Sequence, residues 1–86
     1  MIRYNIYTEN KHLDLIKAVL NQNLESYSIQ EHIGVNKGRE EKGLKIEILG
    51  RYQDEHILYI AGAIKILNQQ ESVLITCERL ENNWSL

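Results

Sequence analysis

The sequence predicts an α+β fold in which strands and helices follow the order strand, helix, strand, strand, helix, strand. Two kinds of apolar periodicity carry this prediction. Apolar residues recur at every second position in four segments, which is typical of half-buried strands. In two further segments they recur at three- and four-residue spacing, which is typical of amphipathic helices. Stretches rich in asparagine, glutamine or glycine separate most of these segments.

The first strand and the first helix follow directly from these patterns. Ile2, Tyr4 and Ile6 alternate with polar residues and predict a half-buried strand at the start of the chain. A helix is predicted from about residue 11 to residue 21, and Asn10 is the expected N-cap because its side chain can accept from the first free helix amides. The expected apolar stripe of this helix consists of Leu13, Leu15, Ile16, Val19 and Leu20.

The second and third strands are predicted to form a hairpin. The second strand has apolar residues on one side, namely Tyr27, Ile29, Ile33 and Val35. Glu31 interrupts that series and predicts a bulge or a strand end. The third strand contains Leu44, Ile46 and Ile48 and ends at Gly50. Between the two strands, residues 36–38 fit a three-residue turn with Gly38 in the left-handed conformation, and Gly43 marks a bulge or a close approach of another backbone.

The second helix and the last strand complete the order. Asp54 is the expected cap of a helix whose apolar face consists of Ile57, Ile60, Ala61, Ile64 and Leu67. Gly62 lies inside this helix, where glycine costs about 1 kcal/mol relative to alanine. A close approach of the helix to the sheet is the expected reason for that glycine. The last strand is predicted to contain Val73, Ile75 and Cys77.

This order is that of a ferredoxin-like βαββαβ domain covering residues 1–86. Right-handed crossovers place both helices on one face of a four-stranded antiparallel sheet and leave the other face open. The residues expected on the open face are Arg3, Asn5, Tyr7, Lys45, Glu47, Leu74, Thr76 and Glu78. Such a face meets a partner subunit or holds a ligand. Trp84, near a polar end, is expected either to fold back on the sheet or to pack against another subunit.

Composition excludes several classes of protein. With 43% apolar and 26% charged residues the chain belongs among globular domains rather than disordered ones. A net charge of −2 argues against a nucleic-acid binder that works by neutralising phosphates. No apolar run is long enough for a membrane span, and the first residues do not form a signal peptide. A single cysteine, Cys77, favours a reducing, cytoplasmic location. The abundance of isoleucine and asparagine is typical of AT-rich genomes such as those of many phages.

The known catalytic and metal-binding motifs are not present. The stretch GREEKGLK has the glycine spacing of a P-loop, but the lysine and the hydroxyl residue that must follow are replaced by Leu44 and Lys45. The KGLKIEIL stretch lacks the aromatic residues of an RNA-recognition motif. His12, His32 and His56 have no metal-ligand spacing. We therefore predict no metal, no cofactor and no catalytic set that the sequence alone can define.

The glycine-rich hairpin is the main candidate binding site. Lys37, Arg39 and Lys42 are expected to contact an anionic ligand, with Gly34 and Gly38 shaping the backbone around it. The alternative is a structural hairpin whose charges are only solvated. Further candidates for contacts lie on the same hairpin, on the first strand and after the second helix: Tyr7, His32, Glu41, Gln70 and Glu71.

Two segments, GVNKGREEKGLKIEI and NQQESVLIT, resemble a family of small bacterial and phage proteins of unknown function. The pattern of that family is a strand-end glycine, an aromatic two residues on, a following glutamate with a small residue, and a QESVL-type entry to the last strand. The matching residues here are Gly34, Gly38, Glu41 and residues 70–74, whereas Asn36 replaces the aromatic. The resemblance covers about a third of the chain and implies the ferredoxin-like fold.

Two functions remain open at this stage. The first is a non-enzymatic, homo-oligomeric binding protein that sequesters a nucleotide-like anionic ligand or blocks a host protein. Such a protein would suit phage or mobile-element counter-defence in the host cytoplasm. The second is a small enzyme with an acid/base site between subunits, in which Tyr7, His32, Glu41 or Glu71 handles protons. We favour binding, because no spacing in the sequence demands catalysis.

Overall fold

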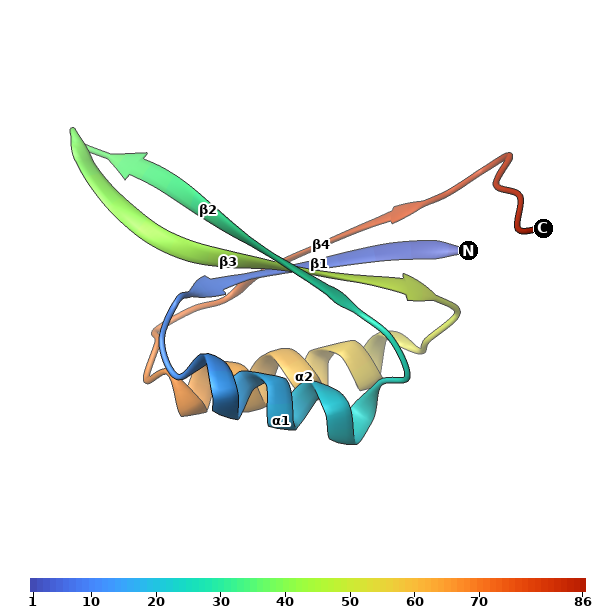
Figure 1. Ribbon diagram of the computed structural model, residues 1–86, viewed down its shortest axis with the longest axis horizontal. Coiled ribbons are helices and arrows are strands. Elements are labelled where there is room, and N and C mark those ends of the chain that lie inside the picture. Colours follow the sequence, from blue (N-terminus) through green and yellow to red (C-terminus); the bar gives the residue numbers. More distant parts are fainter.

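The computed structural model describes residues 1–86 and has the predicted order of elements (Figure 1). The elements are β1 (Ile2–Glu9), α1 (Leu13–Asn23), β2 (Ser28–Asn36), β3 (Arg39–Gly50), α2 (Asp54–Leu67) and β4 (Leu74–Arg79). The strands form one antiparallel sheet in the order β2-β3-β1-β4. The predicted ferredoxin-like α+β fold is confirmed.

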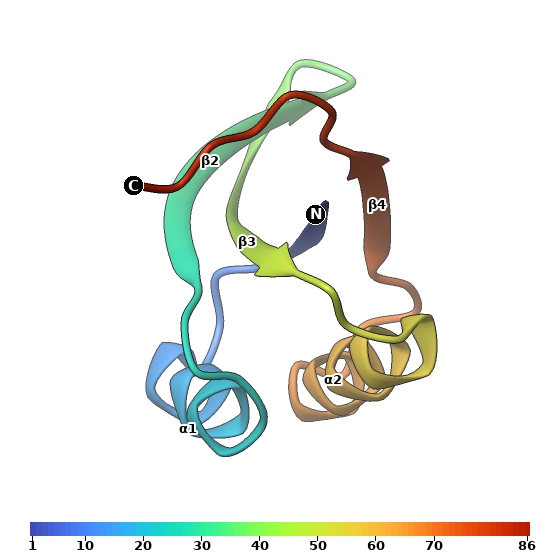
Figure 2. The same ribbon diagram turned by 90° about the vertical axis from the view of Figure 1, so that its right-hand side faces the viewer.

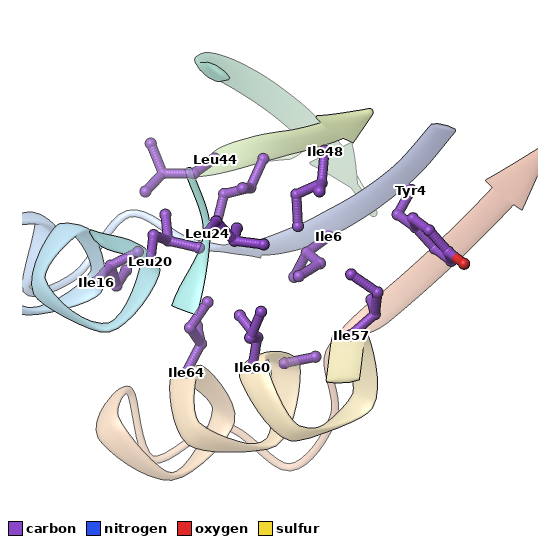
Figure 3. Close-up of a cluster of buried hydrophobic side chains, with 12 residues drawn as sticks. Tyr4, Ile6, Ile16, Leu20, Leu24, Leu44, Ile48, Ile57, Ile60 and Ile64 are labelled. Atoms are coloured by element: carbon purple, nitrogen blue, oxygen red, sulfur yellow. The ribbon is translucent and has the colours of Figure 1, made fainter. Parts of the chain in front are cut away.

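Both helices lie side by side on one face of the sheet, as the end-on view in Figure 2 shows. The core forms between them and the two central strands (Figure 3). Strands β1 and β3 contribute Tyr4, Ile6, Leu44, Ile46 and Ile48, and the helices contribute Ile16, Leu20, Ile57, Ile60 and Ile64. Complete burial of one such aliphatic side chain contributes about 1.5–3 kcal/mol, so this cluster supplies most of the apolar driving force for folding.

The opposite face of the sheet is open, with the residues that the alternation predicts. Asn5 pairs with Glu47 on one side and with Thr76 on the other, and Tyr7 pairs with Lys45 and Leu74. Arg3 lies between two carboxylates on this face. Its guanidinium donates to the Glu78 carboxylate at 2.7 Å and lies 3.6 Å from the Glu47 carboxylate.

The β2–β3 hairpin has a regular register along its whole length. Pairing runs without interruption from Ser28 opposite Glu47 to Asn36 opposite Arg39. The bulge or strand end predicted at Glu31 and the alternative of a bulge at Gly43 are therefore wrong. The turn contains two residues rather than three, because Lys37 (φ 53°) and Gly38 (φ 76°) both adopt the left-handed conformation. The prediction of a left-handed Gly38 is confirmed.

Part of this hairpin extends beyond the rest of the sheet. Residues 33–42, here named the arm, pair only with one another, because β1 pairs with β3 no further than Gly43. Figure 1 shows the arm projecting past the end of β1 and away from the helices. Ile33 and Val35 lie on the side of the arm that would face a helix, and they are 62% and 70% exposed. The arm is thus an unsupported two-stranded ribbon with an apolar side in solvent.

The helix ends differ from the prediction. Helix α1 is preceded by His12 in the left-handed conformation (φ 54°), with no side-chain cap, so the prediction of Asn10 as cap is wrong. Gln53 occupies the N-cap position of α2, and Asp54 lies in the first turn instead. There its carboxylate accepts a hydrogen bond of 3.2 Å from the Tyr4 hydroxyl. The carboxylate of Asp54, which was expected to cap the helix, thus accepts a hydrogen bond from a buried tyrosine of the sheet instead.

Three further details differ from the prediction, at Leu15, at Gly62 and at the start of β4. Leu15 is 55% exposed and does not belong to the apolar stripe of α1. A Cβ at Gly62 would meet no atom within 4 Å, so close packing against the sheet does not explain that glycine. Strand β4 begins at Leu74, so Val73 lies just before it. Trp84 is 84% exposed and is not folded onto the sheet, so of its two predicted placements only packing against another subunit remains.

Candidate functional site

A shallow groove of about 240 Å³ lies where β1 ends beside the base of the arm. Its walls come from three places that are far apart in the sequence: the last residues of β1, the β2–β3 hairpin, and the loop from α2 to β4. The lining residues are Tyr7, Thr8, Glu9, His32, Gly34, Glu41, Lys42, Gly43 and Gln70. Six of the ten site residues predicted from sequence line this groove: Tyr7, His32, Gly34, Glu41, Lys42 and Gln70.

Two aromatic rings form one wall of the groove. Tyr7 and His32 lie with their ring centroids 5.9 Å apart in an edge-to-face arrangement. Gly43 makes room for this arrangement, because a Cβ there would lie 2.8 Å from His32 Nε2 and 3.0 Å from the Thr8 carbonyl oxygen. The predicted close approach of another backbone at Gly43 is therefore confirmed. A side chain at that position would displace the imidazole.

Gly34 and Glu41 pair across the arm and form the outer part of the groove. A Cβ at Gly34 would meet no atom within 4 Å, so the glycine leaves this part of the groove open. Glu41 makes no ion pair. Glu9 also lines the groove, and it pairs with Lys11 at 2.7 Å. The groove therefore offers an unpaired carboxylate beside only one lining cation, Lys42.

Gln70 lines the groove from the loop after α2. Its side-chain oxygen accepts hydrogen bonds from the Thr8 hydroxyl, the Glu9 amide and the Asn68 side chain. Asn68 is only 2% exposed and also donates to Thr8 Oγ1 at 3.0 Å. The loop can make these contacts because Gln69 adopts a left-handed conformation (φ 54°) and reverses the chain. The α2–β4 loop is thus tied to the end of β1.

The other predicted site residues lie outside the groove. Lys37 and Gly38 form the turn at the tip of the arm, and Arg39 follows them directly. Glu71 is exposed in the loop next to Gln70 and does not line the groove. Thr8 and Glu9 line the groove at the end of β1 and are not among the predicted site residues. A polar pair at the end of an apolar strand was the available signal for them.

Two groups outside the groove have shifted acid–base properties. Burial raises the pKa of the Tyr4 phenol, and its hydrogen bond to Asp54 raises that pKa further. The hydrogen bond to Glu78 raises the pKa of the Arg3 guanidinium. No three histidine, cysteine or acidic side chains come together as a set that could hold a metal ion. No helix has the length and apolar content needed to cross a membrane.

The chain matches no protein-family model and no curated protein, but solved structures share its fold. A phage SAM lyase in the apo state is 17% identical over 90% of this chain and 78% of that chain, with a TM-score of 0.69. A DUF3240 family protein from Shewanella baltica OS155 is 15% identical over 99% and 94% of the two chains, with a TM-score of 0.71. A phage SAM lyase in complex with S-methyl-5′-thioadenosine is 17% identical over 90% and 79%, with a TM-score of 0.53. At these identities the likeness shows a shared fold.

Proposed function

We propose that this protein is a homo-oligomeric binding protein that holds a small adenosine-derived molecule in the groove and retains it unchanged. The observation that carries the proposal is the convergence of Tyr7, His32, Glu41 and Gln70 on one groove from three separate parts of the chain. The solved complex of a phage SAM lyase with S-methyl-5′-thioadenosine supports the ligand class, because it has the same fold. Sequestering such a metabolite suits phage counter-defence.

The side chains of the groove suit a nucleoside. Aromatic rings such as those of Tyr7 and His32 can pack against a purine, and a carboxylate such as that of Glu41 accepts hydrogen bonds from ribose hydroxyls. The charges argue against a polyphosphate. Lys42 is the only lining cation, whereas Glu9 and Glu41 are both carboxylates. We therefore propose a nucleoside or a sulfonium nucleoside in place of the anionic ligand that the arm's cations suggested.

Two features support a homo-oligomer. Pockets for small molecules usually enclose about 300–1,000 Å³, which is more than one copy of this groove provides. A second copy lying against the open side would complete the enclosure. The arm also needs support, because an isolated two-stranded hairpin is at best marginally stable in water. Packing of Ile33 and Val35 against another subunit would provide it.

Native mass spectrometry combined with calorimetry tests the proposal. We expect more than one subunit per particle, and binding of added S-methyl-5′-thioadenosine or S-adenosylmethionine with the ligand recovered unaltered. Glu41→Gln should weaken binding about tenfold, as expected for the loss of hydrogen bonds to a charged group. Lys37→Ala combined with Arg39→Ala changes only the tip of the arm and serves as the matched control. A monomer that binds neither molecule would contradict the proposal.

Catalysis in the same groove is the second candidate. It is favoured by one observation, the unpaired Glu41 carboxylate that lines the groove together with His32 and Tyr7. These are groups that can accept or donate a proton next to a bound ligand. Incubation of S-adenosylmethionine with the protein separates the two candidates. Multiple turnovers that disappear in Glu41→Gln would establish an enzyme and rule out simple sequestration.

A further inference from the structure

The Gln70 side-chain amide has only one orientation in this structure. Its oxygen faces the Glu9 backbone amide at 3.2 Å, and its nitrogen faces the Ser72 carbonyl at 3.2 Å. A backbone N–H can only donate and a backbone carbonyl can only accept. If the amide turned over, it would place two donors together at one end and two acceptors at the other. The backbone therefore fixes which end of Gln70 carries the oxygen.

The oxygen of Gln70 has no remaining capacity for a ligand. It accepts from three donors, the Thr8 hydroxyl, the Glu9 amide and the Asn68 side chain. A carbonyl oxygen has two lone pairs, so these three donors already saturate it. The nitrogen carries two hydrogens, and only one of them is used, in the bond to Ser72. Gln70, which lines the groove, thus has a free donor and no free acceptor.

Thr8 and Asn68 donate to the Gln70 oxygen from the interior of the protein. Both side chains are almost fully buried, with 5% and 2% exposure. The orientation of Asn68 is also fixed, because its nitrogen donates to the Glu9 carbonyl at 3.2 Å as well as to Thr8 at 3.0 Å. The Asn68 nitrogen shares its two hydrogens among three acceptors, and the buried Asn68 oxygen has no partner, so the backbone groups of Glu9 and Ser72 are what fix the Gln70 amide. The two residues lie 60 positions apart in the sequence, so only the folded chain assembles the network.

We infer that Gln70 determines specificity by presenting a single hydrogen-bond donor to the ligand, with Thr8 and Asn68 as its positioning residues. The inference rests on the proposed function for the identity of the ligand. It requires the bound molecule to place an acceptor against Gln70, such as a purine ring nitrogen or a ribose oxygen. A ligand that places an amino group there meets donor against donor and is rejected, because the donor of Gln70 is left unpaired.

The first test needs no ligand. In ¹⁵N-labelled protein, the two side-chain amide protons of Gln70 should give separate signals, and the proton bonded to Ser72 should exchange with water more slowly than the other. Thr8→Val removes one bond to the oxygen and should bring the exchange of both protons closer to that of a free glutamine. Thr8→Ser restores the hydroxyl and should restore slow exchange. If both protons of Gln70 in the wild-type protein exchange like those of a free glutamine, the fixed orientation of this amide is wrong.

The second test uses S-methyl-5′-thioadenosine as the probe. Gln70→Glu keeps an oxygen for the three donors but removes the N–H, and it should weaken binding about three- to tenfold. Analogues of the probe that lack one acceptor each, either a ring nitrogen or a ribose hydroxyl, identify the contact. One analogue should lose affinity for the wild-type protein and lose none for Gln70→Glu.

The positioning residues have a matched control. Thr8→Val should weaken binding of the probe and relax discrimination among the analogues, whereas Thr76→Val, a change of the same kind on β4 outside the groove, should leave both as in the wild-type protein. Failure of the wild-type protein to bind the probe would overturn the proposed function and, with it, the role in specificity. Equal binding by the wild-type protein and Gln70→Glu would overturn only the role of Gln70.

Discussion

The sheet of this protein has two halves that follow the same sequence pattern with opposite outcomes. In the half covered by the helices, Ile46 and Ile48 of β3 are fully buried. In the arm, Ile33 and Val35 of β2 are more than half exposed, although they alternate in the same way. Ile29, close to Ile33 on the same side of β2, packs against the core. Alternation therefore selects a face of the sheet, and only a covering layer makes that face a core.

Shortening one isoleucine in each half of the sheet should give the largest difference. Ile46→Ala should lower the free energy of unfolding by about 2–5 kcal/mol, because it leaves a cavity among buried neighbours. Ile33→Ala should change it by no more than about 0.5 kcal/mol in the monomer. Urea unfolding at low protein concentration measures both.

The same two variants also test whether a second subunit covers the arm, when the protein concentration is raised. If a second subunit covers the arm, Ile33→Ala should become destabilising at high protein concentration, since association adds stability by mass action. An equal effect of Ile33→Ala at all concentrations would mean that the arm does not pack against another copy.

The second comparison uses the two glycines of the groove. Gly43→Ala should cost about 1–3 kcal/mol, because the new methyl group would press on His32 and on the backbone oxygen of Thr8. Gly34→Ala meets open space and should stay within about 0.5 kcal/mol. Thermal unfolding of the two variants gives the difference. Equal melting temperatures would show that the base of the arm can yield to a methyl group.

The smallest expected effect is at the tip of the arm. Lys37 adopts a left-handed conformation that a lysine side chain disfavours, whereas asparagine followed by glycine suits a two-residue hairpin turn. Lys37→Asn should therefore stabilise the hairpin by up to about 1 kcal/mol. Gly38→Ala, at φ 76°, should have the opposite effect and is the control. Hydrogen exchange of the arm amides resolves such changes better than global unfolding.

The elements of the fold were predictable because buried positions recur at the period of a strand or a helix, and these positions are apolar. Tyr4, Ile6 and Ile46 had to be apolar once helices covered them. The prediction failed where burial imposes nothing. Glu31 was interpreted as an interruption, but it lies at a regular pairing position opposite Leu44 near the base of the arm. The cap of α2 failed for a different reason, since the bond from Tyr4 to Asp54 is a tertiary contact, and no residue preference predicts the left-handed His12 before α1.

The site was predictable in part for a related reason. His32, Gly34 and Glu41 lie within ten residues of one another, so a single hairpin already brings them together. Tyr7 was placed on the correct face by alternation. The contact between Thr8 and Asn68 could not be predicted, because it depends on a chain reversal at Gln69 that no residue preference requires. Lys37 and Arg39 stood out as charges, but their distance from the groove depends on the length of the arm.

The groove has one wall on the arm and one on the α2–β4 loop. Binding of a ligand in the groove is therefore coupled to the structural order of the arm. Residues 33–42 pair only with one another, so their amides should open to solvent with a lower free energy than those of β1, which lies between two strands. A molecule that bridges Glu41 and Gln70 binds only while the arm is in place. Its binding energy would then suppress local opening of the arm in proportion to saturation. The hydrogen-exchange rates of the arm amides would therefore report the fraction of sites that hold a ligand.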